Sequence, residues 1–404
     1  MSSSVTRVAV IGAGPIGLDA SLAADAAGMD VTLLEAGPSV GTNILAWGHV
    51  RLFTPWEMVV SPRMIGTLRA AGLPLPEGGV PTGADLVERV LSPLAGTPPL
   101  EGRIHTGARV VSVGRAGLLK HEEIGTGRRG LADFRILVAS PDGHEWIVEA
   151  DLVLDCSGTW GNPNPLGAGG IPALGEMSCT AVSHRIPDVE RETAFRGQRT
   201  LVVGAGHSAM TAVVELCRMA AENPGTRIYW AVREPHPHFE ADAGDPLPLR
   251  QRLVRGVADL LRDRSAFLEL ISGVEVSALR DTEEGTQVTL HSPWGQGREL
   301  VVDRIIGLTG SVGDREIYRQ LQVHECYATQ GPMKLSAALL AADAGADCLD
   351  QVSHGAAALA NPEPDFYILG SKSYGRTNTF LLRVGYEQIS DVFSARAGGD
   401  HVAA

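Results

Sequence analysis

The alternation of apolar and polar positions near the start of the chain indicates a strand, a tight turn, a helix and a second strand. Residues 7–11 form a short buried-strand pattern that runs into the glycine-rich turn 12–17. An alanine-rich helical stretch follows at 18–27, and a second strand pattern occupies 30–35. This order is typical of a Rossmann-like α/β domain with a parallel sheet.

The same succession occurs again in the middle of the chain. Residues 199–232 predict a strand, a glycine turn at 204–209, a helix and another strand. Two later strands also match, because 151–158 and 303–310 both begin with aspartate and end with a small hydroxyl residue and glycine. We therefore expect an internal duplication, with two dinucleotide-binding domains of the same class.

The segment between these repeats is less regular. Residues 37–81 are expected to be rich in loops, and 85–94 predicts a helix. A strand at 109–113 precedes a hairpin whose strands are 134–139 and 145–150. With these strands, the predicted fold is a three-layer ββα arrangement.

The end of the chain predicts one more strand and a helix. The strand pattern covers 365–370, and a loop follows at 371–377. A helix is expected at 378–393, with apolar positions that include Phe380 and Ile389. The start of this helix should point back toward the loop.

Length and composition fit a two-domain globular protein. The chain has 404 residues, 44% of them hydrophobic and 20% charged. Its net charge of −13 argues against a nucleic-acid partner, which would require cationic side chains. No apolar run approaches the roughly 20 residues that span a bilayer, and residues 1–6 leave no room for a signal peptide. We expect a cytoplasmic protein without a membrane partner, and the acidic surface is compatible with a dimer.

The first glycine turn has the features of a diphosphate site. Glycines at 12, 14 and 17 let the backbone approach a diphosphate, whose charge is stabilised by unpaired amides at the start of a helix. Glu35 lies 18 positions beyond Gly17, close to the spacing expected for an acid that binds a ribose. The alternative interpretation is a tight turn in an ordinary α/β sheet.

The second turn differs at the end of its second strand. Arg233 occupies the position that Glu35 has in the first repeat. An arginine there can bind a 2′-phosphate, so the pattern favours NADPH over NADH. The alternative is a solvated surface arginine. His207 follows Gly206, and it either contacts the nicotinamide side of the nucleotide or caps the helix.

The remaining polar clusters predict no metal site. Residues 235–245 contain two histidines and several carboxylates, but their spacing matches no common ligand set. This loop is better interpreted as one that shapes access for a substrate. The five cysteines are widely spaced and form no Cys-x-x-Cys motif, which indicates reduced core thiols.

Together these motifs resemble the two-dinucleotide flavoprotein superfamily, which includes disulfide reductases and flavin-dependent class B monooxygenases. The turn Gly204-x-Gly206-x-Ser208-Ala209 and the proline- and glycine-rich stretch 160–170 are similar to the monooxygenase branch. The resemblance covers nearly the whole chain. It implies FAD in the first domain, a nicotinamide nucleotide in the second, and a last helix directed at the flavin ring.

Three departures from the family pattern qualify this resemblance. The paired thiol of the disulfide reductases is missing, which makes that branch a poor match. Of the Baeyer–Villiger signature only His184 lies in the corresponding stretch. The usual Gly-Asp before the last helix is replaced by Gly370-Ser371-Lys372, so Lys372, Ser373 or backbone amides would replace a carboxylate near the ribityl chain.

The segment 47–56 corresponds to a family position near the flavin. Trp47, His49 and Arg51 would suit that place, although a packing loop with two core tryptophans is an equal alternative. Candidates for a catalytic role are His49, Arg51 and His207. The residues expected to contact either nucleotide are Gly12, Gly14, Pro15, Ile16, Gly17, Glu35, Ala36, Trp47, Arg51, Val110, Ser157, Gly158, Gly204, Gly206, His207, Ser208, Ala209, Arg233, Gly310, Gly370, Lys372 and Asn378.

The sequence thus predicts an α/β protein in which an NAD(P)H-binding domain (186–310) is inserted into an FAD-binding domain (1–185 and 311–404). The leading hypothesis is an FAD- and NADPH-dependent monooxygenase that places one oxygen atom from O2 on a small organic substrate through a flavin hydroperoxide. One alternative is a reductase or dehydrogenase that passes electrons to a quinone, a small molecule or a carrier protein. Another is a non-catalytic dinucleotide sensor.

Overall fold

The computed structural model describes residues 5–398, except 241, 243, 264, 294, 343–348 and 350, and the chain divides into two compact units. Unit 1 comprises Met1–Asn162 and Val312–Ala404, and unit 2 is Pro163–Ser311. Residues 163–185, which we predicted in the first domain, therefore lie in unit 2. The reason is that β8 (Val182–Ser183) pairs with β15 (Arg304–Gly307) of that unit.

Unit 1 is built on a five-stranded parallel sheet with the order β16-β7-β1-β2-β3. Its strands are β1 (Arg7–Ile11), β2 (Asp30–Leu34), β3 (Ile104–His105), β7 (Leu152–Asp155) and β16 (Phe366–Ile368). Ile11 lies opposite Leu34 on one side and Asp155 on the other. The carboxyl ends of these strands therefore meet at one edge of the sheet.

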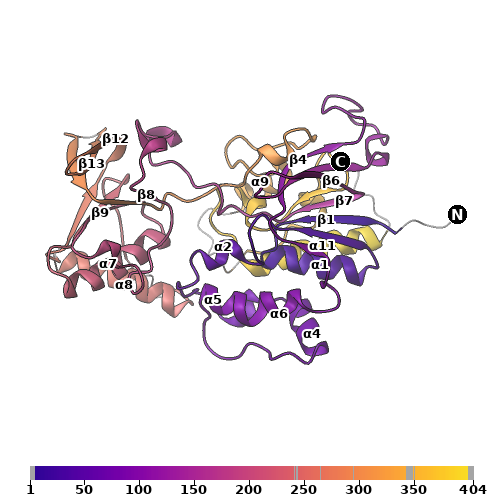
Figure 1. Ribbon diagram of the computed structural model, residues 1–404, viewed down its shortest axis with the longest axis horizontal. Coiled ribbons are helices and arrows are strands. Elements are labelled where there is room, and N and C mark those ends of the chain that lie inside the picture. The colour runs from indigo at the N-terminus through magenta and orange to yellow at the C-terminus, as the bar shows by residue number, and fades with distance from the viewer. Residues whose placement is uncertain are drawn as a thin grey trace. The chain divides into compact units, whose positions relative to one another are not determined.

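Two layers cover this sheet, as the alternation along β1 requires. Val8 and Val10 face a core shared with the helices, whereas Ala9 and Ile11 face a second, antiparallel sheet. Figure 1 shows α1 and α11 on one face and β4 and β6 on the other. The elements are α1 (Pro15–Ala26), α11 (Leu382–Ala397), β4 (Arg109–Arg115), β5 (Phe134–Ala139) and β6 (Glu145–Ala150).

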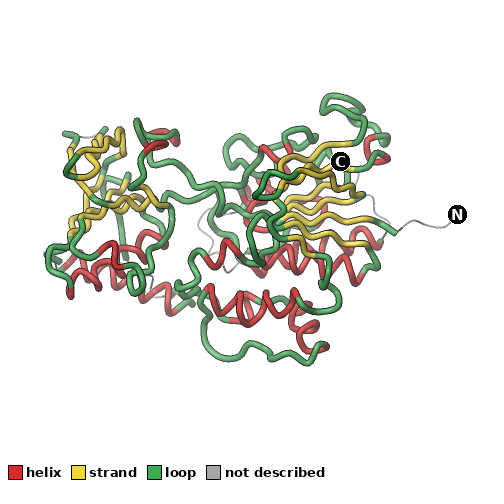
Figure 2. The backbone as a smooth tube through the Cα atoms, viewed as in Figure 1, coloured by secondary structure: helices red, strands yellow, loops and turns green. Residues whose placement is uncertain are grey.

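Unit 2 repeats this plan. Its parallel sheet has the order β11-β10-β9-β15-β8, and alternate residues again face opposite cores, with Val202 toward the helices and Leu201 and Val203 toward a three-stranded sheet. Figure 2 shows the strands of this unit on one side of its helices. The remaining elements are β9 (Arg199–Val203), β10 (Arg227–Val232), β11 (Leu268–Ser272), β12 (Glu275–Thr282), β13 (Gly285–His291), β14 (Arg298–Val302), α7 (His207–Glu222) and α8 (Pro248–Arg262). The predicted ββα layering is confirmed in both units.

The duplication extends to single ion pairs. In unit 1, Arg7 donates from its backbone amide to Asp151 Oδ2 (2.7 Å) and from Nη2 to Oδ1 (2.7 Å). In unit 2, Arg199 makes the same two contacts to Asp303, also at 2.7 Å. The aspartate that opens each closing strand therefore fixes the start of the first strand beside it.

Residues 37–81 are rich in loops, as predicted, and three helices lie among these loops. This segment contains α2 (Thr42–Leu45), α3 (Trp56–Val59) and the longer α4 (Pro62–Ala70). The hydroxyl of Ser61 accepts a hydrogen bond from the amide of Met64, and Pro62 occupies the first helical position. Proline is favoured at the start of a helix, because its missing N–H would have no partner within the helix there.

The predicted helix at 85–94 is present as a continuous helical run made of α5 (Gly83–Leu86), a π-helical turn at Val87–Leu91 and α6 (Ser92–Ala95). The C-terminal part adds α9 (Met333–Ala341) and α10 (Ala356–Leu359). These helices supply apolar side chains to the same core as α1 and α11.

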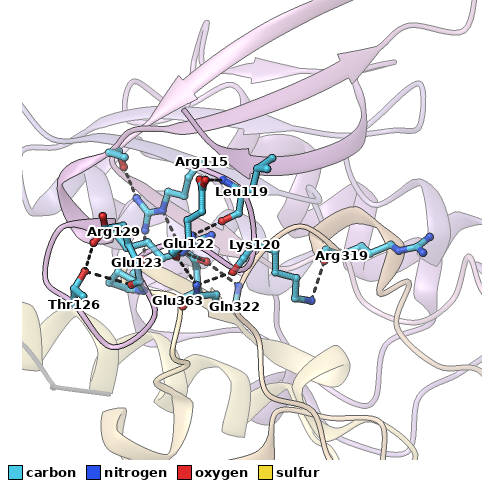
Figure 3. A network of polar contacts seen from close by, with 12 residues as sticks. Arg115, Leu119, Lys120, Glu122, Glu123, Thr126, Arg129, Arg319, Gln322 and Glu363 are labelled. Carbon is cyan, nitrogen blue, oxygen red and sulfur yellow. Dashed lines mark hydrogen bonds and ion pairs between the residues drawn. The ribbon is translucent and has the colours of Figure 1, made fainter. Parts of the chain in front are cut away.

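A buried polar network joins the N-terminal and C-terminal parts of unit 1. The carboxylate of Glu363 accepts hydrogen bonds from Arg115 Nε (2.8 Å), Arg129 Nε (2.9 Å) and the amide of Gln322 (2.8 Å). Figure 3 shows both arginines converging on it. The three charged side chains are at most 1% exposed. Because Glu363 precedes β16, this network lies at the amino end of that strand.

We expect Glu363→Ala to lower the free energy of unfolding by about 3–5 kcal/mol, because it leaves two buried guanidinium groups without their carboxylate. The matched control is Glu316→Ala, which removes an exposed ion pair with Arg319 and should change stability by less than about 0.5 kcal/mol. Urea denaturation followed by circular dichroism measures both. Equal, small effects of the two substitutions would contradict the prediction.

Candidate functional site

The first glycine turn follows β1 at the carboxyl edge of the unit 1 sheet. Gly12 has a φ of +96°, and its amide donates to the carbonyl of Leu34 (2.7 Å). A Cβ at Gly12 would lie 2.8 Å from the carbonyl oxygen of Cys156, and one at Gly17 would lie 1.8 Å from the carbonyl oxygen of Gly12. Both positions therefore require glycine for the fold itself.

Gly14 has a different role from these two glycines. A Cβ at Gly14 would have no heavy atom within 4 Å, so the chain does not need glycine there for its own packing. Gly14 is the N-cap of α1, and no side chain caps the helix. Open space therefore lies against unpaired amides at the positive end of a helix dipole, which is an arrangement that suits a diphosphate.

The carboxylate of Glu35 is held at this turn. Its Oε2 accepts from the amide of Ala13 and its Oε1 from the amide of Gly37, each at 2.7 Å. An ionised carboxylate has about four acceptor positions, so two amides leave capacity for ribose hydroxyls. This geometry fits the role predicted for Glu35.

The second glycine turn reproduces the first in unit 2. Gly204 has a φ of +124°, its amide donates to the carbonyl of Ala231 (3.1 Å), and a Cβ there would lie 2.3 Å from the carbonyl oxygen of Leu308. Gly206, like Gly14, has open space where a Cβ would point, and it is the N-cap of α7. The geometry of the first turn is thus repeated in unit 2.

Two basic residues lie at this second turn. Arg233 directly follows β10 and is exposed, so its guanidinium is available to an anion. His207 is the first residue of α7, directly after the N-cap Gly206. Desolvation and the nearby Arg250 guanidinium lower the pKa of His207, and Asp245 opposes this shift. A bidentate ion pair joins Arg250 to Asp245, with distances of 2.7 and 2.8 Å.

The structure places Lys372 differently from our prediction. Its ammonium donates to Asp155 Oδ2 (2.6 Å) and Ser157 Oγ (3.0 Å), and the lysine is 2% exposed. Our prediction that Lys372 replaces a carboxylate near the ribityl chain did not anticipate this pairing. Sequence reasoning missed Asp155, which looked like one position of an apolar strand. An acid inside such a strand was the available signal.

The predicted start of the last helix is corrected by the structure. Asn378 does not begin the last helix, because α11 starts at Leu382 and Leu381 has extended backbone. Phe380 and Leu381 are apolar because they pack against the core from outside the helix. Among the predicted nucleotide contacts, Pro15, Ile16, Val110 and Ala209 are buried.

Several further residues lie near the first turn. Gly158 and Gly370 have positive φ, and a Cβ at Gly158 would lie 3.7 Å from Ser371 Oγ. The rings of Trp47 and Trp160 are 6.3 Å apart and tilted by 52°. The structure thus brings the predicted Trp47 to the loop that follows β7.

The other candidates in the sequence are placed as follows. Arg51 donates from Nη1 to the carbonyl of Val80 (2.5 Å), and His49 is exposed. In unit 2, His184 Nδ1 lies 3.0 Å from the carbonyl oxygen of Gly307, and Gly310 has a φ of +84°. Across the described residues, no helix is long and apolar enough to cross a membrane.

The two classes of glycine should respond differently to alanine. We expect Gly12→Ala and Gly204→Ala to lower the melting temperature, because each new methyl group would collide with a carbonyl of the neighbouring strand. Gly14→Ala and Gly206→Ala should leave it nearly unchanged. Differential scanning calorimetry of the four variants tests this, and a large destabilisation by Gly14→Ala or Gly206→Ala would be inconsistent with the open geometry.

No protein-family model and no curated protein matches this sequence. Solved structures do match the fold. The bacillithiol disulfide reductase Bdr (YpdA) from Bacillus cereus has a TM-score of 0.69 and 17% identity, over 98% of this chain and 100% of that one. The cadaverine monooxygenase DfoA from Erwinia amylovora, solved with FAD, has a TM-score of 0.67 and 13% identity, over 99% and 96%. The ornithine hydroxylase PvdA from Pseudomonas aeruginosa gives 0.63 and 14%, over 99% of each chain. The chain therefore has the fold of the two-dinucleotide flavoproteins, as its sequence predicted.

Proposed function

We propose that this chain is an FAD- and NADPH-dependent monooxygenase that transfers one oxygen atom from O2 to a small organic substrate. Each of the two duplicated turns has one glycine that the fold requires and one glycine beside open space. This geometry supports the binding of two nucleotides. Similar folds occur in a disulfide reductase and in cadaverine and ornithine hydroxylases. The environment of the chain's own cysteines supports oxygen transfer over disulfide reduction.

The observation that carries the proposal is the state of Cys156. It is the cysteine whose backbone contacts the first glycine turn, and the residue is buried. Desolvation, followed by the charge of Asp155, raises the pKa of this thiol well above its usual value. Because the thiolate is the reactive species in disulfide exchange, Cys156 is unsuited to reducing a disulfide. The described cysteines form no disulfide with one another.

In this proposal each unit holds one nucleotide. Bound FAD would supply hydride acceptance from NADPH and the reaction with oxygen. The amides of the first turn and the start of α1 would hold its diphosphate, and Glu35 would bind its ribose hydroxyls. In unit 2, the start of α7 would hold the NADPH diphosphate and Arg233 the 2′-phosphate. In this way the chain would orient both nucleotides. The class of substrate is to be identified by experiment.

The test is turnover with oxygen. We expect the purified chain to bind FAD, NADPH to bleach its visible absorption under anaerobic conditions, and oxygen to restore it with an oxygenated product. Products are measured by mass spectrometry with 18O2. If the reduced protein returns to its oxidised form with stoichiometric hydrogen peroxide for all substrates tried, and anaerobic turnover proceeds with a quinone or disulfide, the protein is a reductase.

One residue favours that reductase as the second candidate. Hydrogen bonds from Thr329 and Ala328 hold the pKa of Cys326 below its usual value. Cys326 itself is buried, and the carbonyl of Thr329 in the same loop accepts from the amide of Arg376 (2.6 Å). Loss of anaerobic disulfide turnover in Cys326→Ser would identify this activity.

We expect Arg233→Ser to raise the Kd for NADPH by roughly 10- to 100-fold, the value of one charge-assisted phosphate contact. The Kd for NADH should change little, because NADH lacks the 2′-phosphate. The matched control is Arg227→Ser at the opposite end of β10, which should leave both constants unchanged. Isothermal titration calorimetry measures them, and equal effects on the two nucleotides would exclude a 2′-phosphate contact.

A further inference from the structure

The ion pair of Asp155 and Lys372 is a deeply buried charge pair at the carboxyl edge of the unit 1 sheet, which also carries the first glycine turn. The two side chains are 0% and 1% exposed and 2.6 Å apart. Asp155 ends β7, whereas Lys372 lies in the short 3-10 helix Gly370–Tyr374 that follows β16. Both strands end at the edge that carries the first glycine turn. The pair therefore connects two neighbouring strand ends where a nucleotide would bind.

Ser157 links this pair to the glycine turn. The ammonium of Lys372 donates to Ser157 Oγ, and Ser157 also donates from its hydroxyl to Asp155 Oδ1 (2.6 Å). The Cα of Ser157 would lie 2.9 Å from a Cβ at Gly12. Only one residue thus separates the ammonium from the backbone of the turn.

A third segment of the chain packs closely against Lys372. Gly313 follows the point where the chain returns to unit 1 at Val312. A Cβ at Gly313 would lie 2.4 Å from Lys372 Cγ and 3.0 Å from its Cδ and Cε, so the lysine stem occupies the space of a missing side chain. The ring of Tyr318 lies 5.0 Å from the ammonium, within range for a cation–π contact. One ammonium thus joins the ends of β7 and β16 to the returning chain.

A charge pair in this place has a consequence for an anionic ligand. Burying two charges is costly, and a pair of this kind contributes little net stability compared with apolar residues of the same volume. Near a diphosphate, however, the ammonium neutralises a carboxylate that would otherwise repel the ligand. If Lys372 lost its charge, Asp155 would remain as a buried, unpaired group beside the turn.

We infer that Lys372 is a positioning residue for FAD, which neutralises Asp155 and holds Ser157 against the first glycine turn. This inference rests on the proposed function, since it takes FAD as the ligand of unit 1. It assigns Lys372 an indirect role, through Asp155 and Ser157, in place of the direct ribityl contact predicted from the sequence.

The experiment compares FAD affinity in four full-length proteins after removal of flavin. We expect Lys372→Met to raise the Kd for FAD by roughly 30-fold or more, the effect of leaving a buried charge without its partner. The double variant Asp155→Asn/Lys372→Met, in which both charges are gone, should recover most of that loss. The control Asp151→Asn changes an aspartate that directly precedes β7, at the end of the strand away from Asp155, and should bind FAD with the wild-type Kd. Quenching of flavin fluorescence gives the Kd values, and circular dichroism confirms folding.

A purely structural lysine would behave differently, because its loss would lower the melting temperature and leave the Kd unchanged. A folded Lys372→Met protein with the wild-type Kd, or a double variant no better than Lys372→Met, overturns the inference. Failure of the wild-type chain itself to bind FAD overturns the proposed function instead.

Gly313→Ala provides a second probe if Lys372→Met does not fold. This change keeps both charges and displaces the lysine stem, so it should weaken FAD binding by several-fold. An unchanged Kd in a folded Gly313→Ala protein also overturns the inference.

Discussion

The close approach of a glycine to the neighbouring closing strand is the constraint on which both units depend. At Gly12 and at Gly204 the chain turns with positive φ, and the place of a side chain is filled by a carbonyl group, of Cys156 in one unit and of Leu308 in the other. This contact fixes where the first helix of each unit starts. The open face at Gly14 and Gly206 is a result of that geometry, because the amides are exposed only if the turn is this tight.

Features governed by local sequence could be predicted well. The strands that flank the two turns, the turns themselves and the hairpin at β5 and β6 follow from periodicity and from glycine spacing, whereas β11 and the sheet of β12, β13 and β14 were not predicted. The acid Glu35 was predicted for the same reason, since its distance from the turn is set by one helix and one strand. The local pattern also gave a wrong prediction at Asn378. Apolar residues that pack outside the helix made the predicted helix begin about one turn too early.

Features that depend on distant parts of the chain could not be predicted. Lys372 and Asp155 are 217 positions apart, and Glu363 is 248 positions from Arg115. No periodicity connects such residues, and each alone looks like an ordinary charged position. Gly313 illustrates the same limit, because its reason for being glycine is the stem of a lysine from another segment. Pairing of this kind is decided by topology, and it appears only when the sheet order is known.

The order in which the ribosome delivers these segments adds a consequence for biogenesis. Unit 1 is interrupted at Asn162 and resumes at Val312, and β16 is the last strand of the chain to be made. Until it emerges, the edge of β7 has no neighbour on that side, and Asp155, Arg115 and Arg129 lack their partners. Unpaired strand edges in nascent chains favour association with other chains. Unit 2, which is continuous, is free of this delay and can complete its sheet during synthesis while the first unit waits for its final strand.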